Sequence, residues 1–227
     1  FGFGDHKAFA SYIPKEYKRG RVGGYYSSGV DRALIVTSPV DDDEFSRVLI
    51  FHEFVHHMVR ATGERLPPWY NEGLAELFST VRVDRQANMV EVGHHSDWRA
   101  REAFEKEFLP MEQLFGIDYD STIYRGSGHT GIFYAQSWAT LHYWFFGRSN
   151  LPESGAATFL NLVTQRLPPQ GPDLRKGFIE AFGIDYPEMQ RRIERYLTGG
   201  KYQWKRWKLP AIPPEGSYAV RPVSRDE

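Results

Sequence analysis

The chain has 227 residues, with 28 Lys or Arg against 29 Asp or Glu, eight histidines and no cysteine. A formal net charge of −1 gives no reason to expect nucleic acid or an anionic membrane as a partner, and the lack of cysteine excludes disulfides and thiolate metal sites. No apolar run reaches the roughly 20 residues that a membrane-spanning helix needs.

Apolar periodicity and turn residues predict these elements in the N-terminal half: a hairpin at 22–28 and 32–37, a helix over about 43–61 ended by Gly63, a break at Pro67 and Pro68, a shorter helix over about 70–79, and a hairpin at 80–84 and 88–92. For the C-terminal half they predict helical structure over 97–115 broken near Pro110, a loop at 126–131, an amphipathic helix ending at Gly147, two or three helices within 154–198, and one possible strand near 202–208. Strands followed mainly by helices indicate the α+β class.

We expect a single domain over residues 1–200. Within it, an N-terminal sheet and the long helix would occupy about 1–65, and the helical part about 66–200. Residues 201–227 are rich in proline and polar residues, so we expect an extended tail or a linker toward further domains.

The long predicted helix carries the sequence HEFVHH at 52–57. His52 and His56 are four residues apart, so both imidazoles project from one helix face and could share one Zn²⁺. Glu53 lies about 100° from His52 around the helix axis, which places it beside a metal as a general base rather than on it. His57 lies on the Glu53 side and is expected to be structural. We expect the opposite face to be buried, with Phe51, Phe54, Val55 and Met58.

A pair of histidines does not complete a catalytic zinc site, which usually has three protein ligands. Glu72 and Glu76 form another pair with a spacing of four residues, on the helix that follows the two prolines. If this helix packs against the first, Glu72 could be the third ligand, and Glu76 could accept a hydrogen bond from a ligand histidine. The alternatives are two surface histidines and a solvated acidic helix face.

HEFVH (52–56) followed by WYNEGLA (69–75) resembles the gluzincins, the clan of metallopeptidases that includes thermolysin and the aminopeptidase N family. NEGLA is similar to the family's NEGFA stretch, which implies that Glu72 is the third zinc ligand and that Glu76 supports the site. FYAQSWA (133–139) is similar to the stretch whose tyrosine stabilises the oxyanion, which implies that role for Tyr134. Gln136 and Ser137 depart from the family's Lys-Gly, so a plain core tyrosine stays an alternative.

Residues from about 20 to 198 look like the peptidase MA-like domains of bacterial proteins, in stretches such as PPWYNEGLAELF and FYAQSWATLHYW. The resemblance implies a zincin-like fold, with a small, mostly antiparallel sheet above the active-site helix and a mainly helical C-terminal subdomain. In zincins the substrate adds as a strand to the sheet edge, so Tyr25 and Tyr26 could line the cleft. His129, in the GSGHTG loop, is a second candidate for contact with the oxyanion. His94 and His95 are expected to be ordinary surface histidines.

The resemblance implies a zinc-dependent peptidase with one Zn²⁺ per chain, acting on a peptide or protein. The G-x-M-E-N sequence that holds a free amino terminus in aminopeptidase N relatives is absent, which favours an endopeptidase. The alternative is a catalytically silent peptidase-like domain that binds peptides or a protein partner, and a purely structural zinc is a third possibility. The sequence leaves the compartment open, although the resemblance favours an extracytoplasmic bacterial protein.

Overall fold

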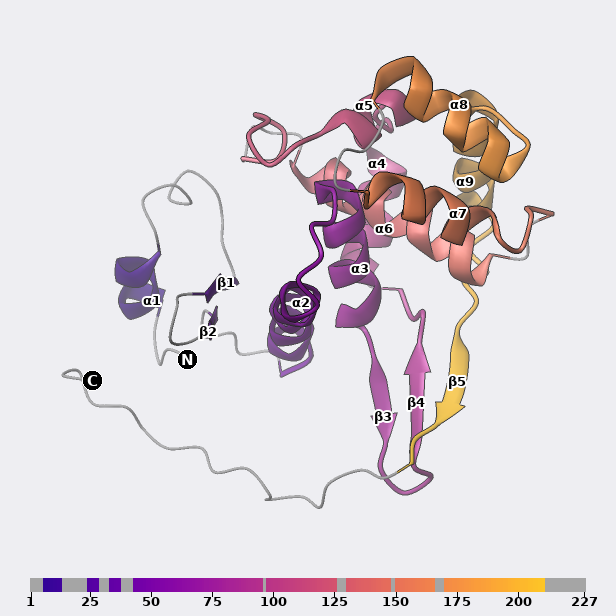
Figure 1. Ribbon diagram of the computed structural model, residues 1–227. Helices are drawn as coiled ribbons and strands as arrows, with labels where there is room; N and C mark the ends of the chain where they lie inside the picture. The colour runs from indigo at the N-terminus through magenta and orange to yellow at the C-terminus, as the bar shows by residue number, and fades with distance from the viewer. Residues whose placement is uncertain are drawn as a thin grey trace.

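The computed structural model describes residues 6–13, 24–28, 33–37, 43–95, 97–125, 130–147, 150–165 and 170–210. Across these residues the chain is α+β and mostly helical, with two small antiparallel sheets, as the sequence predicted (Figure 1). The helices are α1 (His6–Tyr12), α2 (Asp43–Ala61), α3 (Pro68–Ser79), α4 (Asp97–Glu105), α5 (Met111–Gly116), α6 (Thr130–Phe146), α7 (Gly155–Val163), α8 (Gly171–Phe182) and α9 (Tyr186–Thr198). The strands are β1 (Gly24–Ser28), β2 (Ala33–Thr37), β3 (Arg82–Asp84), β4 (Met89–Val92) and β5 (Lys205–Lys208).

Helix α3 begins at Pro68, two residues before the predicted start. Proline is tolerated in the first helical turn because the N–H it lacks would have no partner inside the helix. Pro67 is extended and caps the helix, and its carbonyl accepts the N–H groups of Tyr70 and Asn71. The two prolines therefore start the helix as well as separating it from α2.

Helices α3 to α9, here called the helical body, share one aromatic core around α6. The largest fully buried side chains include Trp69, Trp138, Phe133, Phe159 and Phe178. At Gly73, an added Cβ would lie 2.8 Å from both the Ser137 carbonyl and the Leu141 side chain. A glycine at this position therefore lets α3 approach α6 closely, and this approach fixes where α3 presents its polar side chains.

Helix α2 lies between the β1–β2 hairpin and the helical body (Figure 1). The prediction that its apolar face is buried is wrong: Phe54 is 47% exposed and Met58 is 52% exposed, while Phe51 and Val55 are only half-buried. The reason is that α2 packs on α3 and on the hairpin through the side that carries Glu53, His52 and His56. The polar side of this helix is thus the covered side.

The second sheet has the strand order β3-β4-β5, with antiparallel pairs throughout. The strand expected near 202–208 is present as β5, and it pairs with β4 so that Val90 lies opposite Trp207 and Glu91 opposite Arg206. Folded structure therefore continues past residue 200 to at least Lys208. The sheet projects from the helical body (Figure 1).

Candidate metal centre

Helices α2 and α3 bring three potential metal ligands to one point. The Nε2 atoms of His52 and His56 lie 3.2 Å apart, and the Oε2 atom of Glu72 lies 3.3 Å from the first and 3.4 Å from the second. Among the described residues, this is the one group of three or more His, Asp or Glu side chains whose potential ligand atoms all lie within 4.8 Å of one another. The structure thus assembles the three residues that the sequence proposed as ligands.

The dimensions of this triangle fit a small tetrahedral cation. Ligand atoms about 2.0–2.1 Å from a tetrahedral Zn²⁺ lie about 3.3–3.4 Å from one another, which matches the three observed edges. Glu72 Oε2 is also buried without a hydrogen-bond partner, although both imidazoles are close to it. A buried carboxylate oxygen in that state is costly, and a shared cation would satisfy it. The donor set, two imidazoles and a carboxylate, is one that zinc takes in catalytic sites.

Electrostatics hold Glu72 in the ionised form. Burial would raise its pKa, but the nearby charges of His56 and His52 outweigh burial and lower that pKa well below the usual range. Burial likewise opposes the charged form of His56, yet the Glu72 carboxylate raises the pKa of His56 to about 9. The pair therefore favours a positive charge next to Glu72, which can be a proton or a metal cation.

A second layer of side chains orients His52. Glu76, one turn after Glu72 on α3, places Oε1 3.4 Å from His52 Nδ1. A proton on Nδ1 leaves the Nε2 lone pair free for a cation, so this contact selects the useful tautomer. The Arg99 guanidinium of α4 forms ion pairs with Glu76 Oε1 at 2.5 Å and with Glu102 Oε2 at 2.8 Å. Glu76 therefore lies beside a candidate ligand histidine, as the sequence analysis expected. Arg99 is an additional supporting residue that the sequence analysis did not identify.

The segment between α5 and α6 supplies two tyrosines that sequence reasoning missed. Tyr124 donates a hydrogen bond of 2.9 Å to Glu72 Oε1, so one oxygen of the carboxylate is occupied and Oε2 faces the histidines. Burial, followed by the charge of Glu72, raises the pKa of Tyr124 far above its ordinary value and keeps it a donor. Tyr119 accepts a hydrogen bond from Asn71 and donates one to the Leu66 carbonyl. Asn71 itself lies close enough to His56 to raise that residue's pKa.

Glu53 is buried beside the triangle. Burial raises its pKa, more than the charges of His52 and His56 lower it. The main-chain N–H of Tyr26 in β1 contacts the carboxylate, and a Cβ added to Gly24 would lie 3.7 Å from Glu53 Cγ. The backbone of β1 therefore runs past Glu53, whose carboxylate is not one of the three converging donors.

Tyr134 of α6 lies on the helical-body side of the triangle. Its ring is stacked on that of His52 with 6.1 Å between centroids, and the Arg99 guanidinium carbon lies 5.1 Å from its ring centre. Burial, then the charge of Glu72, raises the pKa of Tyr134 well above its ordinary value. Its hydroxyl stays protonated in this setting and can only be a hydrogen-bond donor to a developing anion. Gln136, by contrast, bonds both main-chain groups of Leu109 away from the site.

The remaining candidates lie elsewhere. Tyr25 donates its hydroxyl to the Tyr12 carbonyl of α1, and the Tyr26 hydroxyl lies 3.3 Å from His57 Nδ1, so both hydroxyls contact groups other than the three converging donors. His129 lies outside the described residues. His94 and His95 pair with Glu91 and Asp97 next to the second sheet.

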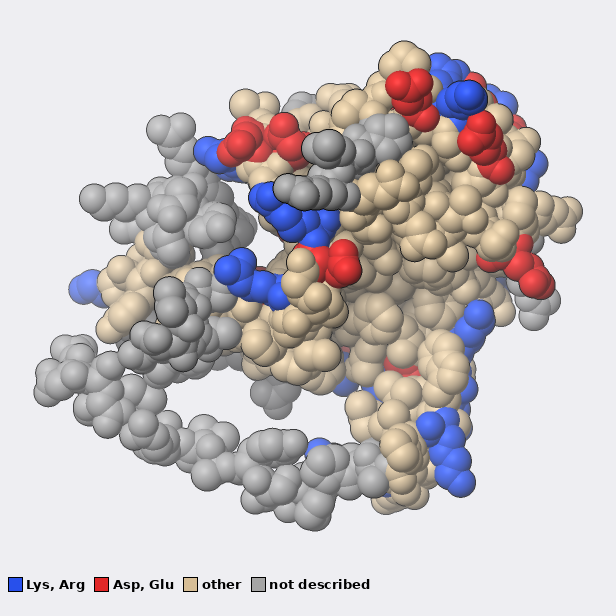
Figure 2. Space-filling model, in the orientation of Figure 1, with Lys and Arg blue, Asp and Glu red and all other residues tan. Residues whose placement is uncertain are grey.

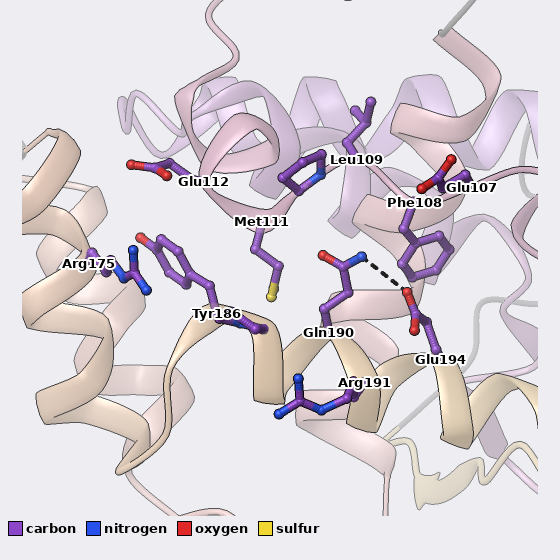
Figure 3. Close-up of a pocket in the computed structure, with 12 residues that line it drawn as sticks. Glu107, Phe108, Leu109, Met111, Glu112, Arg175, Tyr186, Gln190, Arg191 and Glu194 are labelled. Carbon is purple, nitrogen blue, oxygen red and sulfur yellow. Dashed lines mark hydrogen bonds between the residues drawn. The ribbon is translucent and has the colours of Figure 1, made fainter.

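A surface hollow of about 670 Å³ lies on another part of the helical body (Figure 3). It is lined by residues 107–112, by Arg175 of α8 and by α9 residues between Tyr186 and Glu194, with Met111 near its centre. Arg175 is already paired with Asp185, and Arg191 with Glu188. None of the candidate metal ligands lines this hollow, so it is separate from the metal centre.

No protein-family model, no curated protein and no solved structure matches the chain. None of the described helices has the length and apolar character needed to cross a membrane. Support for a function therefore comes from the geometry of the metal centre.

Proposed function

We propose that the chain is a zinc-dependent peptidase of the gluzincin type, with a zincin-like fold, and that endopeptidase activity is the more favoured form. The observation that carries this proposal is the triangle of donor atoms from His52, His56 and Glu72, with edges of 3.2–3.4 Å. A structural zinc site would need a fourth protein ligand. Among the described residues, only three donors converge, which leaves a position open for chemistry.

A zinc ion held by these three residues would polarise a scissile carbonyl and make a water molecule acidic near neutral pH. Glu53 would accept the proton of that water and deliver it to the leaving amine. A carboxylate whose pKa is raised by burial suits this role, because it accepts a proton more readily than an ordinary glutamate and, once protonated, remains acidic enough to donate to an amine. Tyr134 would donate a hydrogen bond to the oxyanion, a contact typically worth about 2.7–4 kcal/mol in the transition state.

The edge of β1 gives a place for an extended substrate. The Tyr26 main-chain N–H contacts the Glu53 carboxylate, so β1 runs beside the candidate centre. A peptide that added as a strand along this edge would pass its carbonyl groups close to Glu53. This arrangement does not require a free amino terminus, in line with the absence of a G-x-M-E-N sequence.

The test combines zinc analysis with cleavage of an unstructured protein. We expect one zinc per chain in the wild type and in Glu53→Gln, and cleavage by the wild type that falls about 10²–10⁴-fold in the variant. His56→Gln should lose the metal, while His57→Gln, its neighbour in sequence, should keep it. Lack of stoichiometric zinc after loading would overturn the proposal. Bound zinc without any cleavage would favour the silent, peptide-binding alternative.

A further inference from the structure

The two oxygens of the Glu72 carboxylate have different surroundings. Oε2 lies 3.3 Å from His52 Nε2 and 3.4 Å from His56 Nε2, and it has no hydrogen-bond partner. Oε1 accepts a hydrogen bond of 2.9 Å from the hydroxyl of Tyr124. The residue is only 1% exposed, so bulk water has little access to either oxygen. One oxygen is therefore directed to the two imidazoles, while the other is already bound to a tyrosine.

Contacts around the Tyr124 ring hold its hydroxyl at this oxygen. The ring packs edge-on against Tyr119, with 5.1 Å between centroids, and against the fully buried Phe133 of α6, with 6.1 Å between centroids. The carbonyl of the neighbouring Ile123 accepts a hydrogen bond of 3.1 Å from the side chain of Thr130, the first residue of α6. Because both the ring and the adjacent main chain are fixed, the hydroxyl keeps its position.

The segment between α5 and α6 contacts α3 through its tyrosines and presents its charged residues to water. The Tyr119 hydroxyl donates to the carbonyl of Leu66, shortly before α3, at 3.0 Å. Arg125 pairs with Asp120, and both side chains are mostly exposed; Figure 2 shows acidic and basic side chains together at this segment. Tyr119 and Tyr124 therefore attach the segment beside α3 at two points.

The number of oxygens that Glu72 offers decides how many ligands a cation receives from the chain. A carboxylate can bind a cation through one oxygen or through both. With one oxygen, the chain supplies three donor atoms and leaves a tetrahedral cation one open position. With both oxygens, the chain supplies four, which suits cations that take more oxygen ligands, such as Mn²⁺. The hydrogen bond to Oε1 therefore bears on the choice of metal and on the open position.

The alternative is that Tyr124 only fastens its segment, as Tyr119 does. Tyr119 bonds a main-chain carbonyl and the amide of Asn71, and it touches none of the three candidate ligands. Tyr124 instead donates to an ionised ligand carboxylate, and hydrogen bonds to ionised groups are roughly twice as strong as those between neutral groups. This bond draws charge from Oε1 and makes it the poorer donor to a cation, so that Oε2 is favoured.

We propose that Tyr124 is a positioning residue that restricts Glu72 to one oxygen toward the cation, and thereby makes the centre selective for four-coordinate Zn²⁺ with one open position. This inference rests on the proposed function, because it concerns the same centre. Tyr124→Phe keeps the ring and its packing but leaves Oε1 buried without a partner, which is costly. The second oxygen then turns to the cation, so the variant changes the coordination number and keeps the metal.

The experiment replaces zinc with Co²⁺, whose visible absorption is strong in four-coordinate sites and weakens when a further ligand is added. We expect one Co²⁺ per chain in the wild type and in Tyr124→Phe, with bands about twofold weaker or more in the variant. Tyr119→Phe removes a hydroxyl from the same segment and should keep the wild-type spectrum. In competition titrations, Tyr124→Phe should shift the preference between Zn²⁺ and Mn²⁺ about tenfold toward Mn²⁺.

The outcomes separate this inference from the proposed function. A wild type that binds neither Zn²⁺ nor Co²⁺ would overturn both. A wild type that binds Co²⁺ with weak bands of higher coordination would overturn the inference alone, and this measurement needs no variant. Circular dichroism melts establish that the variants stay folded. An unchanged spectrum in Tyr124→Phe, loss of Co²⁺ from that folded variant, or equal changes in Tyr119→Phe would each show that Tyr124 does not set the coordination number.

Discussion

The candidate metal centre is built from two regions that are held in place in different ways. Helix α2 contributes His52, Glu53 and His56 from a helix whose apolar side is open to solvent. The helical body contributes Glu72 from α3, supported by side chains from α4, the segment after α5, and α6. One half of the centre thus lies on a lightly covered helix and the other half on a closely packed core.

The difference in packing between α2 and the helical body indicates which contacts fix the geometry of the three candidate ligands. Glu72 is held by Tyr124, and Glu76 by Arg99, so the carboxylate side of the triangle is fixed by partners within the helical body. His52 and His56 are positioned by their contacts with that side. We infer that damage to the helical body should disturb the centre strongly, whereas changes on the open face of α2 should not.

The largest expected effect is loss of the aromatic core. Trp69 is fully buried between Phe115, Trp144 and Phe159. Trp69→Ala should lower the free energy of unfolding by about 3–5 kcal/mol, because it removes a large buried side chain and leaves a cavity. Urea denaturation followed by circular dichroism measures this change. Trp207→Ala, at an exposed tryptophan, is the matched control and should cost less than about 1 kcal/mol.

Acid should weaken the helical body at its junction with the second sheet. His142 donates from Nε2 to the Gly93 carbonyl at 2.7 Å and accepts from Tyr196 at Nδ1, so the ring is neutral. Burial lowers the pKa of His142 to about 4, below its unfolded value near 6.5. The unfolded chain therefore binds a proton first, and about 3 kcal/mol of stability should be lost as the pH falls from 6.5 to 4.

The check is the free energy of unfolding as a function of pH in the wild type and in His142→Gln. The glutamine amide can still donate to the Gly93 carbonyl but does not titrate. We expect the slope between pH 6.5 and 4 to be shallower in the variant. Parallel curves in the two proteins would show that other groups cause the acid loss.

The sequence predicted most elements because their signals are local. Proline, glycine and apolar periodicity determine where α2, α3 and the hairpins begin and end, and the four-residue spacings place His52, His56 and Glu72 on helix faces. Arg99 and Tyr124 were not predicted, because their partners Glu76 and Glu72 are 23 and 52 residues away in sequence. Only packing of α4 and of the segment after α5 reveals such contacts.

The open face of α2 was predicted wrongly for a related reason. Periodicity shows that a helix has a polar side and an apolar side, but it does not show which side the rest of the chain covers. Here the polar ligands face α3 and the hairpin, and Phe54 and Met58 face outward. The positive charge that residues 81–92 and 201–210 carry together was missed too, because these segments are far apart in sequence within a chain whose total charge is near zero.

An intermediate effect is expected where the helical body orients a ligand. Arg99→Lys keeps one positive charge but loses the fork that bridges Glu76 and Glu102. Zinc affinity should fall about 10–100-fold, as is typical when a residue supporting a metal ligand is changed. Calorimetric titration with zinc measures this, and Arg192→Lys, which faces Glu188 on α9, is the control. Unchanged affinity in Arg99→Lys would remove Arg99 from the support of the centre.

The smallest effect is expected on the open face of α2. Phe54→Gln and Met58→Gln, alone and combined, should change the free energy of unfolding by less than about 0.5 kcal/mol, because both side chains already contact water. Zinc affinity should also stay as in the wild type, since neither residue touches the triangle. Urea denaturation and zinc titration measure the two quantities. A loss of about 2 kcal/mol or more would mean that this face is covered in solution, and α2 would then be held as firmly as the helical body.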